Sequence, residues 1–282
     1  MKTGLVLEGG AMRATYTIGV LDVLMENKIS FDGVIGVSAG AIHGASYVSN
    51  QPGRNIRYYK KYGSDKRFMS KRNLIFTGDL FGKKFCYEDL PWKLDIFDND
   101  TFKNSRTEFY AVCANVETGE SEYVRLNDLR QPVQMDYLRA SASMPLVSKI
   151  VETDGKKLLD GGITDSIPLK KFQEMGFAKN VVVATRTDSY IKTEEQIGIA
   201  GLVYKKYPRF VEALRKRPVM YNNEKAYILD QEKKGSIFFI RPHEELGISR
   251  TDVNPDHLER VYQIGRRDAE AVLDKLKAWL EG

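Results

Sequence analysis

Apolar positions follow two different spacings along the chain. Continuous apolar runs of strand length lie at 4–7, 33–37, 108–116, 122–126 and 180–186. Segments in which apolar residues recur three or four positions apart, the spacing of one helix face, lie at 15–26, 39–48, 133–144 and about 255–280. Because buried strand-like runs alternate with helical segments, the pattern predicts an α/β sandwich that contains parallel strands.

The pattern shows no break that would divide the chain. It contains no internal repeat, no low-complexity tract and no obvious linker. We therefore expect a single domain over 1–282, in which a core over about 4–190 carries the motifs described below and 191–282 is a mainly helical part of the same domain. The segment 51–107 has the least regular pattern, and we expect it to be an insertion.

Composition limits the class of protein and its location. Of the 282 residues, 42% are hydrophobic and 29% are charged, and a chain of this length can bury one large core or two modest ones. The two cysteines, Cys86 and Cys113, match neither a metal-binding pattern nor a disulfide framework, which indicates a reduced intracellular protein. No apolar run approaches the roughly 18 residues that span a bilayer, and the start "MKTGLVLEGG" has no signal-peptide cleavage site. We expect a cytoplasmic location.

A serine flanked by small residues follows the second predicted strand. The stretch "GVIGVSAGAIHGA" places Ser38 between Gly36 and Gly40, where a strand gives way to a helix. A serine on such a sharp turn has a strained backbone, and bulky neighbours two residues away would collide with the adjacent strand and helix. The turn exposes the hydroxyl near a helix N-terminus, whose amides favour developing negative charge. This arrangement is typical of an acyl-transfer nucleophile.

A glycine turn follows the first predicted strand. In "LVLEGGAMRA", Gly9 and Gly10 lie between strand and helix, where backbone N–H groups can point at an anion. The spacing does not match the G-x-G-x-x-G pattern of dinucleotide-binding proteins. A tight packing turn would use the same residues, but the serine motif lies only 25 or so residues further along the chain. An oxyanion hole is therefore the better account.

A third turn lies in "KKLLDGGITDSIPL", where Asp160 ends an apolar run before Gly161 and Gly162. A carboxylate against a glycine turn can accept a proton from a nearby serine if the site is dry enough to raise its pKa above the reference of about 4. Taken alone, an aspartate that hydrogen-bonds to its own turn is the simpler interpretation.

The three turns together resemble the motifs of the patatin-like phospholipase family. "GGAMRA", "GVSAG" and "DGG" stand in that family's order, and "ASASMPLVSKI" (140–150) is similar to the Ala-Ser-x-x-x-Pro stretch that usually precedes the aspartate turn. The resemblance covers roughly 4–190. It implies a three-layer α/β/α sandwich of the patatin-like type with a mainly parallel central sheet.

The resemblance also implies roles for individual residues. Ser38 would be the nucleophile and Asp160 the base of a Ser-Asp dyad, and the amides of Gly10 and Ala11 would bind the oxyanion. Arg13 matches the basic position of the glycine motif. The implied function is hydrolysis of lipid esters, with no metal and no cofactor. Phospholipids, lysophospholipids, acylglycerols and simple esters all remain open as substrates.

Two positions depart from the family's glycine motif. Ala11 stands where the third glycine is usual, and Ala14 where the last one is. Alanine still donates an N–H group, so we expect a working oxyanion hole, although the φ range of alanine is narrower than that of glycine.

The histidines leave a second kind of hydrolase open. The order Ser38, Asp160 and then His243 or His257 matches the Ser, acid, His order of α/β-hydrolases, although only one strand precedes the serine strand here. His43 lies five residues after Ser38, about 140° round the following helix. We therefore expect His43 to be structural.

A basic stretch suggests a third interpretation, a non-catalytic surface binder. The segment 54–72 holds eight Lys or Arg residues and one Asp, a net charge of +7 in a chain whose total is +5. Aromatic residues are interleaved with these cations, as at the boundary between water and acyl chains. No nucleic-acid motif accompanies the stretch, so we expect an anionic membrane surface rather than nucleic acid. An ordinary solvated face is the simpler alternative.

Overall fold

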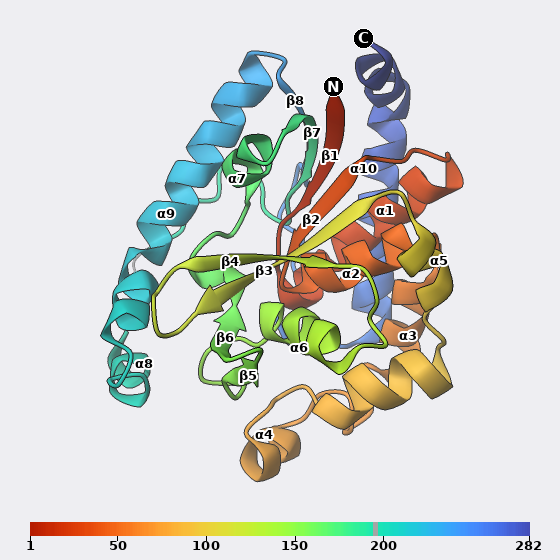
Figure 1. Cartoon of the computed structure of the whole chain (residues 1–282). Coiled ribbons are helices and arrows are strands. Elements are labelled where there is room, and N and C mark those ends of the chain that lie inside the picture. Colours follow the sequence, from red (N-terminus) through yellow and green to blue (C-terminus); the bar gives the residue numbers. More distant parts are fainter. Residues whose placement is uncertain (194–196) are drawn as a thin grey trace.

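The computed structural model describes residues 1–193 and 197–282, with an eight-stranded sheet through the centre (Figure 1). The strands are β1 (Lys2–Leu7), β2 (Gly33–Val37), β3 (Glu108–Asn115), β4 (Ser121–Leu126), β5 (Val151–Thr153), β6 (Lys156–Asp160), β7 (Phe177–Val183) and β8 (Ile237–Ile240). Their order is β5-β6-β3-β2-β1-β7-β8, and β4 pairs with β3. The neighbouring strands in the part β3-β2-β1-β7-β8 are parallel. The pairs that involve β4, β5 and β6 are antiparallel. The predicted, mainly parallel sheet is confirmed.

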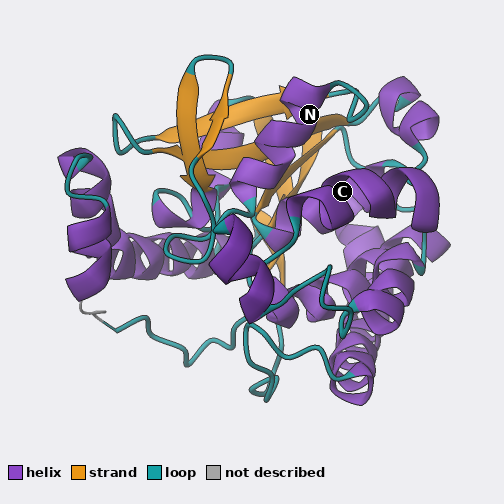
Figure 2. Ribbon diagram, turned by 90° about the horizontal axis from the view of Figure 1, so that it is seen from below, coloured by secondary structure: helices purple, strands orange, loops and turns teal. Residues whose placement is uncertain are grey.

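Helices cover both faces of this sheet. They are α1 (Thr15–Glu26), α2 (Ala39–Val48), α3 (Arg54–Tyr62), α4 (Lys71–Thr77), α5 (Asn99–Asn104), α6 (Pro132–Ser141), α7 (Leu169–Glu174), α8 (Gly198–Val203), α9 (Pro208–Lys233) and α10 (Pro255–Glu281), with short turns η1 (Ala11–Ala14) and η3 (Gly161–Ile163) and a π-helix η2 (Phe85–Leu94). Helices α1, α2 and α10 lie on one side of the sheet, and α7 and α9 lie on the other (Figure 1). Figure 2 shows helices on both sides of the strands. The architecture is the predicted three-layer α/β/α sandwich.

Alternate residues of the central strands are buried against opposite helix layers. In β1, Leu5 and Leu7 belong to the core on the side of α1, α2 and α10. Val6, between them, packs in the core that contains Phe172 of α7 and Ile228 of α9. Side chains alternate across a strand, so a strand covered on both faces is apolar at every position. This is why the strands appear in the sequence as continuous apolar runs.

The C-terminal part of the chain is joined to the same sheet. Strand β8 pairs in parallel with β7. Helix α10 lies along α1, where the Tyr16 hydroxyl donates to Asp268 at 3.1 Å and the Tyr262 hydroxyl donates to Asp22 at 2.8 Å. The segment expected to be mainly helical therefore also supplies a strand to the central sheet.

Strand β3 brings two distant segments to one place. One of its edges pairs with β4. The other edge of β3 pairs first with β2, and this pairing ends where Val37 is opposite Val112. The same edge then pairs with β6, where Asp160 is opposite Cys113. Ser38 follows Val37, so Ser38 and Asp160 meet where the parallel strands end. In open α/β sheets this end of the strands is where ligands bind.

The element bounds agree best with the sequence near the N-terminus. The helices predicted over 15–26 and 39–48 and the strand predicted over 33–37 are confirmed at those bounds. The strand predicted over 180–186 ends at Val183, so its predicted end is wrong. The chain leaves the sheet there because the N–H of Thr185 donates to the carboxylate of Glu8.

The basic stretch 54–72 differs from its prediction. Tyr58, Tyr59 and Phe68 were expected beside the cations at a water–lipid boundary, and that expectation is wrong because all three are buried. Arg54 is also buried, and its guanidinium lies 3.4 Å from the carboxylate of Asp95. The exposed cations of the stretch are Arg57, Lys60, Lys61, Lys66, Arg67, Lys71 and Arg72.

Candidate active site

Ser38 forms the sharp turn between β2 and α2. Its backbone has φ 56° and ψ −126°, a conformation that costs a non-glycine residue about 1–3 kcal/mol. The N–H of Ser38 donates to the hydroxyl of Ser141 at 3.0 Å, and its carbonyl accepts from the N–H groups of Ala41 and Ile42 in α2. These bonds hold the strained turn, so the serine side chain has a fixed position at the end of the strand.

The two flanking glycines allow α2 to lie very close to the sheet. A Cβ atom on Gly40 would lie 2.5 Å from the carbonyl oxygen of Leu7, and one on Gly36 would lie 2.6 Å from the Cα atom of Ala41. Neither position has room for a side chain, because the obstacle in each case is backbone. Substitution of either glycine would displace the helix that begins at Ser38.

Asp160 lies beside Ser38 in a buried position. Its carboxylate accepts a hydrogen bond from the N–H of Gly162 at 2.8 Å. Burial raises the pKa of Asp160 above its ordinary value. Smaller effects lower this pKa, namely hydrogen bonds from the Ser38 hydroxyl and the Gly162 amide and the positive charges of Arg217 and Arg250. A carboxylate with a raised pKa is a better proton acceptor, which suits a general base.

The turn after Asp160 is held by its own contacts. A Cβ atom on Gly161 would lie 2.2 Å from the carbonyl oxygen of Val112, so this position also has no room for a side chain. The carbonyl of Gly162 accepts hydrogen bonds from the Arg217 guanidinium at 2.6 Å and from the Ser166 hydroxyl at 2.8 Å. Arg217 of α9 is thereby fixed close to Asp160.

The turn after β1 places backbone amides beside Ser38. A Cβ atom on Gly9 would lie 2.9 Å from the Cβ atom of Ser38. Within residues 1–193 and 197–282, the N–H groups of Gly10 and Ala11 have no hydrogen-bond acceptor. Ala11 has φ 49°, a left-handed conformation that glycine adopts at lower cost. Two unpaired N–H groups next to a nucleophile can receive an oxyanion.

Glu8 and Arg13 support this turn from the inside. The buried carboxylate of Glu8 accepts hydrogen bonds from the N–H and hydroxyl of Thr185 and from the hydroxyl of Tyr221. The guanidinium of Arg13 is attracted to Glu8, but burial and repulsion from Arg186 are larger effects and lower the pKa of Arg13 to about 10.

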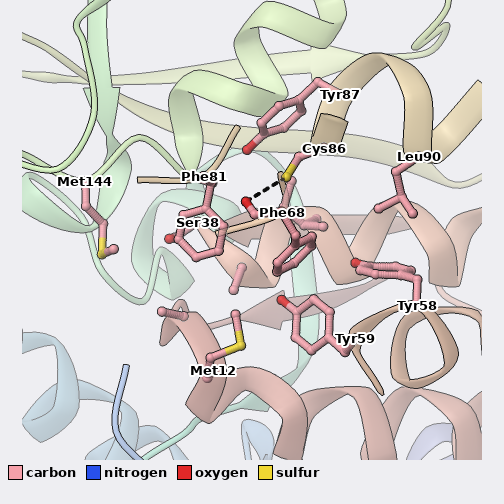
Figure 3. A pocket seen from close by; sticks show the side chains of 14 residues that line it. Met12, Ser38, Tyr58, Tyr59, Phe68, Phe81, Cys86, Tyr87, Leu90 and Met144 are labelled. Atoms are coloured by element: carbon pink, nitrogen blue, oxygen red, sulfur yellow. Dashed lines mark hydrogen bonds between the residues drawn. The ribbon is translucent and has the colours of Figure 1, made fainter. Parts of the chain in front are cut away.

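A small apolar cavity of about 80 Å³ opens on one side of Ser38. Figure 3 shows Ser38 and Met144 at one side of this cavity, with Tyr58 and Leu90 at the other. The aromatic rings between them include Phe68, which the sequence had suggested was at the surface. The segment 58–90 thus supplies half of the residues that line this cavity next to the serine.

A larger polar cleft of about 440 Å³, partly lined by charged side chains, lies on the other side. Ser38, Asp160, Gly10 and Ala11 all line it. No histidine lines either cavity among the described residues. The described residues also hold no group of three or more His, Cys, Asp and Glu side chains that could bind a metal ion.

None of the three histidines lies where a Ser-Asp-His triad would need it. His43 is fully buried against Tyr59, and burial lowers its pKa to about 3. His257 is exposed and pairs with Asp252 at 2.9 Å, and His243 is exposed near α10. The geometry therefore disfavours the triad.

Comparison with known families shows the family of the chain. A family model described as patatin-like phospholipase matches residues 5–172. The chain belongs to the patatin-like phospholipase family. A second model, of a domain of unknown function, matches residues 207–281 of this patatin-like chain, which include α9, β8 and α10.

Individual relatives are distant. An uncharacterized Escherichia coli protein, YjjU, is 25% identical over 94% of this chain and 75% of its own length. The lysophospholipase nte1 of Aspergillus niger is 26% identical over 62% of this chain, and that match spans 11% of the fungal protein. Among solved structures, VipD of Legionella pneumophila aligns over 97% of this chain and 67% of its own with 14% identity and a TM-score of 0.47.

Three residues of the site carry no role in the sequence prediction. Ser141 lies in the stretch noted before the aspartate turn, and a serine there could have suggested a partner for the nucleophile turn. Arg217 and Arg250 belong to no motif. They reach the cleft from α9 and from the loop before α10, and only the folded chain brings them near Asp160.

Proposed function

We propose that the protein is a serine-dependent lipid acyl hydrolase that uses a Ser38–Asp160 dyad. The main support is the juxtaposition of a strained serine, a buried carboxylate that interacts with its hydroxyl, and two amides without acceptors among the described residues. The name of the fungal relative, a lysophospholipase, agrees with a lipid ester as substrate.

In the proposed reaction Asp160 accepts a proton twice and releases it twice. As the Ser38 oxygen bonds to the ester carbonyl carbon, its proton passes to the Asp160 carboxylate, and the amides of Gly10 and Ala11 stabilise the oxyanion. Collapse of this intermediate breaks the bond to the alcohol oxygen, which takes the proton from Asp160. Asp160 then removes a proton from water as the water attacks the acyl-enzyme, and Ser38 recovers a proton as the fatty acid leaves.

The two cavities suggest how the ester would lie. The apolar cavity beside Met12 and Leu90 suits the acyl chain, since apolar and aromatic side chains form most of its lining. The polar cleft then holds the alcohol part. In this orientation the carbonyl lies between them at Ser38, which lines both cavities.

A serine-reactive fluorophosphonate probe distinguishes a hydrolase from a non-catalytic lipid binder. We expect the probe to form one covalent adduct, on the peptide that contains Ser38, because an activated serine attacks phosphorus as it attacks a carbonyl carbon. Intact-protein and peptide mass spectrometry measure the site and extent of labelling. Absence of an adduct on folded protein, or an adduct only at other serines, would favour the binder.

We also propose a peripheral contact with anionic membranes at the end of the basic stretch. Lys66, Lys71 and Arg72 are exposed, and within the described residues they have no carboxylate partner. Ile75 and Phe76 of α4, directly after them, are 76% and 78% exposed. Cations beside exposed apolar side chains suit a lipid surface. No helix of the described chain is long and apolar enough to cross a bilayer.

Replacing Lys66, Lys71 and Arg72 with Gln should weaken binding to anionic vesicles at least tenfold at low salt, because each cation near such a surface contributes about 1 kcal/mol. Co-sedimentation at low and high salt measures the effect, which should shrink at about 1 M salt where the Debye length is about 3 Å. Hydrolysis of a soluble short-chain ester should not change.

The matched control replaces the exposed residues Lys233 and Lys234 at the C-terminal end of α9 and Lys275 near the C-terminal end of α10. These two helix ends lie at the end of the molecule opposite α4 (Figure 1). This variant has the same net charge but should bind vesicles as the wild type does. Equal loss of binding in both triple variants would show that binding depends only on the total charge of the protein, and the proposed contact would be wrong.

A further inference from the structure

Four arginines from separate segments line the polar cleft that holds Ser38. They are Arg13 of η1, Arg186 after β7, Arg217 of α9 and Arg250 of the loop before α10. Their charges act on one another and on the reaction site. Burial lowers the pKa of Arg13, and Arg186 and Arg250 lower it further. Burial raises the pKa of Asp160, and Arg217 and Arg250 offset part of this rise. The four guanidinium groups therefore surround one region beside the nucleophile.

Two of these arginines are incompletely satisfied. The Nε atoms of Arg13 and Arg186 are buried and have no hydrogen-bond partner among the residues that the structure describes. The other contacts of Arg186 are weak or non-directional. Its Nη1 lies 3.4 Å from the exposed carboxylate of Glu245, and its guanidinium stacks 4.1 Å from the centre of the Tyr190 ring. A buried donor without an acceptor lowers the stability of the fold unless a ligand supplies the acceptor.

The negative charges in the cleft do not balance the arginines. Glu8 and Asp160 are the carboxylates among its described lining residues. Glu8 already accepts hydrogen bonds from Thr185 and Tyr221, and Asp160 interacts with Ser38 and Gly162. The cleft thus presents an excess of positive charge in a concave, partly dry space, where an anion is bound more strongly than on an open surface.

We propose that Arg186 and Arg250, with Arg13 behind them, form a phosphate-binding subsite, so that the preferred substrate is an ester whose alcohol part carries an anionic phosphate. The inference rests on the proposed function and specifies its substrate. A phosphate offers several acceptor oxygens to several guanidinium forks at once, whereas a carboxylate satisfies one fork. Each carboxylate lining the described cleft already has partners, so the site favours a head group without an ammonium.

The experiment compares two esters that differ only in the phosphate. Octanoyl lysophosphatidate and monooctanoylglycerol share acyl chain and glycerol, and both are used below the concentration at which they aggregate. We expect the wild type to prefer lysophosphatidate in kcat/KM by about a hundredfold. In Arg250→Gln and Arg186→Gln this preference should fall about ten- to a hundredfold, because each substitution removes a hydrogen-bonded charge pair with the phosphate. Arg250 is exposed, so its substitution should not disturb folding.

Arg215→Gln is the matched control. Arg215 is an exposed arginine of α9 that does not line the cleft, and its replacement should change neither the activity nor the preference. A wild-type preference near one, or a preference that survives in both cleft variants, overturns the phosphate subsite while leaving the hydrolase intact.

Calorimetric titration measures binding at the subsite in protein that cannot carry out the proposed reaction. Inorganic phosphate and octanoyl lysophosphatidate are titrated into Ser38→Ala protein and into the same protein that also carries Arg250→Gln. Tighter binding of lysophosphatidate than of inorganic phosphate, with both weakened by Arg250→Gln, supports a head-group site even if no ester is hydrolysed. Tight binding of inorganic phosphate alone would indicate a site for the free ion and overturn the head-group assignment.

Discussion

Replacing Ser38 with alanine is expected to lower kcat for a short-chain nitrophenyl ester by about a millionfold, to the background of the assay. The Ser38 oxygen is the atom that forms the acyl bond in the proposed reaction. Ser166 also lines the cleft, but its hydroxyl donates to the carbonyl of Gly162. The alanine side chain is smaller and keeps the backbone N–H that donates to Ser141. The fold should therefore be retained, as measured by circular dichroism and thermal unfolding.

An exposed serine gives the control for this substitution. Ser64 lies in the loop after α3, away from both cavities, and Ser64→Ala should have wild-type activity. Substantial turnover by purified Ser38→Ala, above that of a mock purification, would show that another group attacks the ester. The nucleophile assignment would then be wrong, and the arrangement of glycines around Ser38 would have only a packing role.

The parts of the fold that the sequence predicts best are those whose signals are local. The segment from β1 to α2 has two strands that are buried over most or all of their length, each followed by a glycine-rich turn and a helix. Within it Ser38 has to adopt a positive φ, and Gly40 has to approach the carbonyl of Leu7. Each of these requirements restricts residue type within a few positions, so the order of elements and the candidate nucleophile are visible without the structure.

The helix α3 shows why the basic stretch was misinterpreted. Its sequence "RNIRYYKKY" alternates cations with aromatic residues, which on an extended chain would place both kinds at one surface. On a helix the same residues separate. Ile56, Tyr58 and Tyr59 are buried, while Lys60 and Lys61 are exposed. Since the interpretation ignored the helical period, it assigned to the surface two aromatic residues that line the apolar cavity.

The remaining site residues depend on contacts between distant segments. Asp160 meets Ser38 because β6 continues along the edge of β3 where β2 ends. Only resemblance to a family could link the two residues in advance. Arg186, Arg217 and Arg250 come from a strand end, a long helix and a loop, and no local pattern marks them. The sequence therefore locates the proposed reaction but not the charge of the substrate it prefers.

Replacing Asp160 with asparagine is expected to lower kcat by about three to five orders of magnitude, the range seen when a catalytic acid or base is removed. Asparagine has nearly the same shape and can still accept the hydrogen bond from Gly162 through its side-chain oxygen. It cannot take a proton from Ser38. His243→Ala and His257→Ala should remain within about tenfold of wild type, since both histidines are exposed and line neither cavity.

The pH dependence of the wild type gives a second measure of the same assignment. Burial raises the pKa of Asp160 above 3.8, and the base must be unprotonated to act. As pH falls through this raised pKa, kcat/KM should therefore decline, at a pH higher than an ordinary aspartate would give. Folding is checked at each pH by circular dichroism.

The substitutions decide between the two possible bases. If a histidine variant loses as much activity as Asp160→Asn while remaining folded, the base is a histidine and the dyad assignment fails.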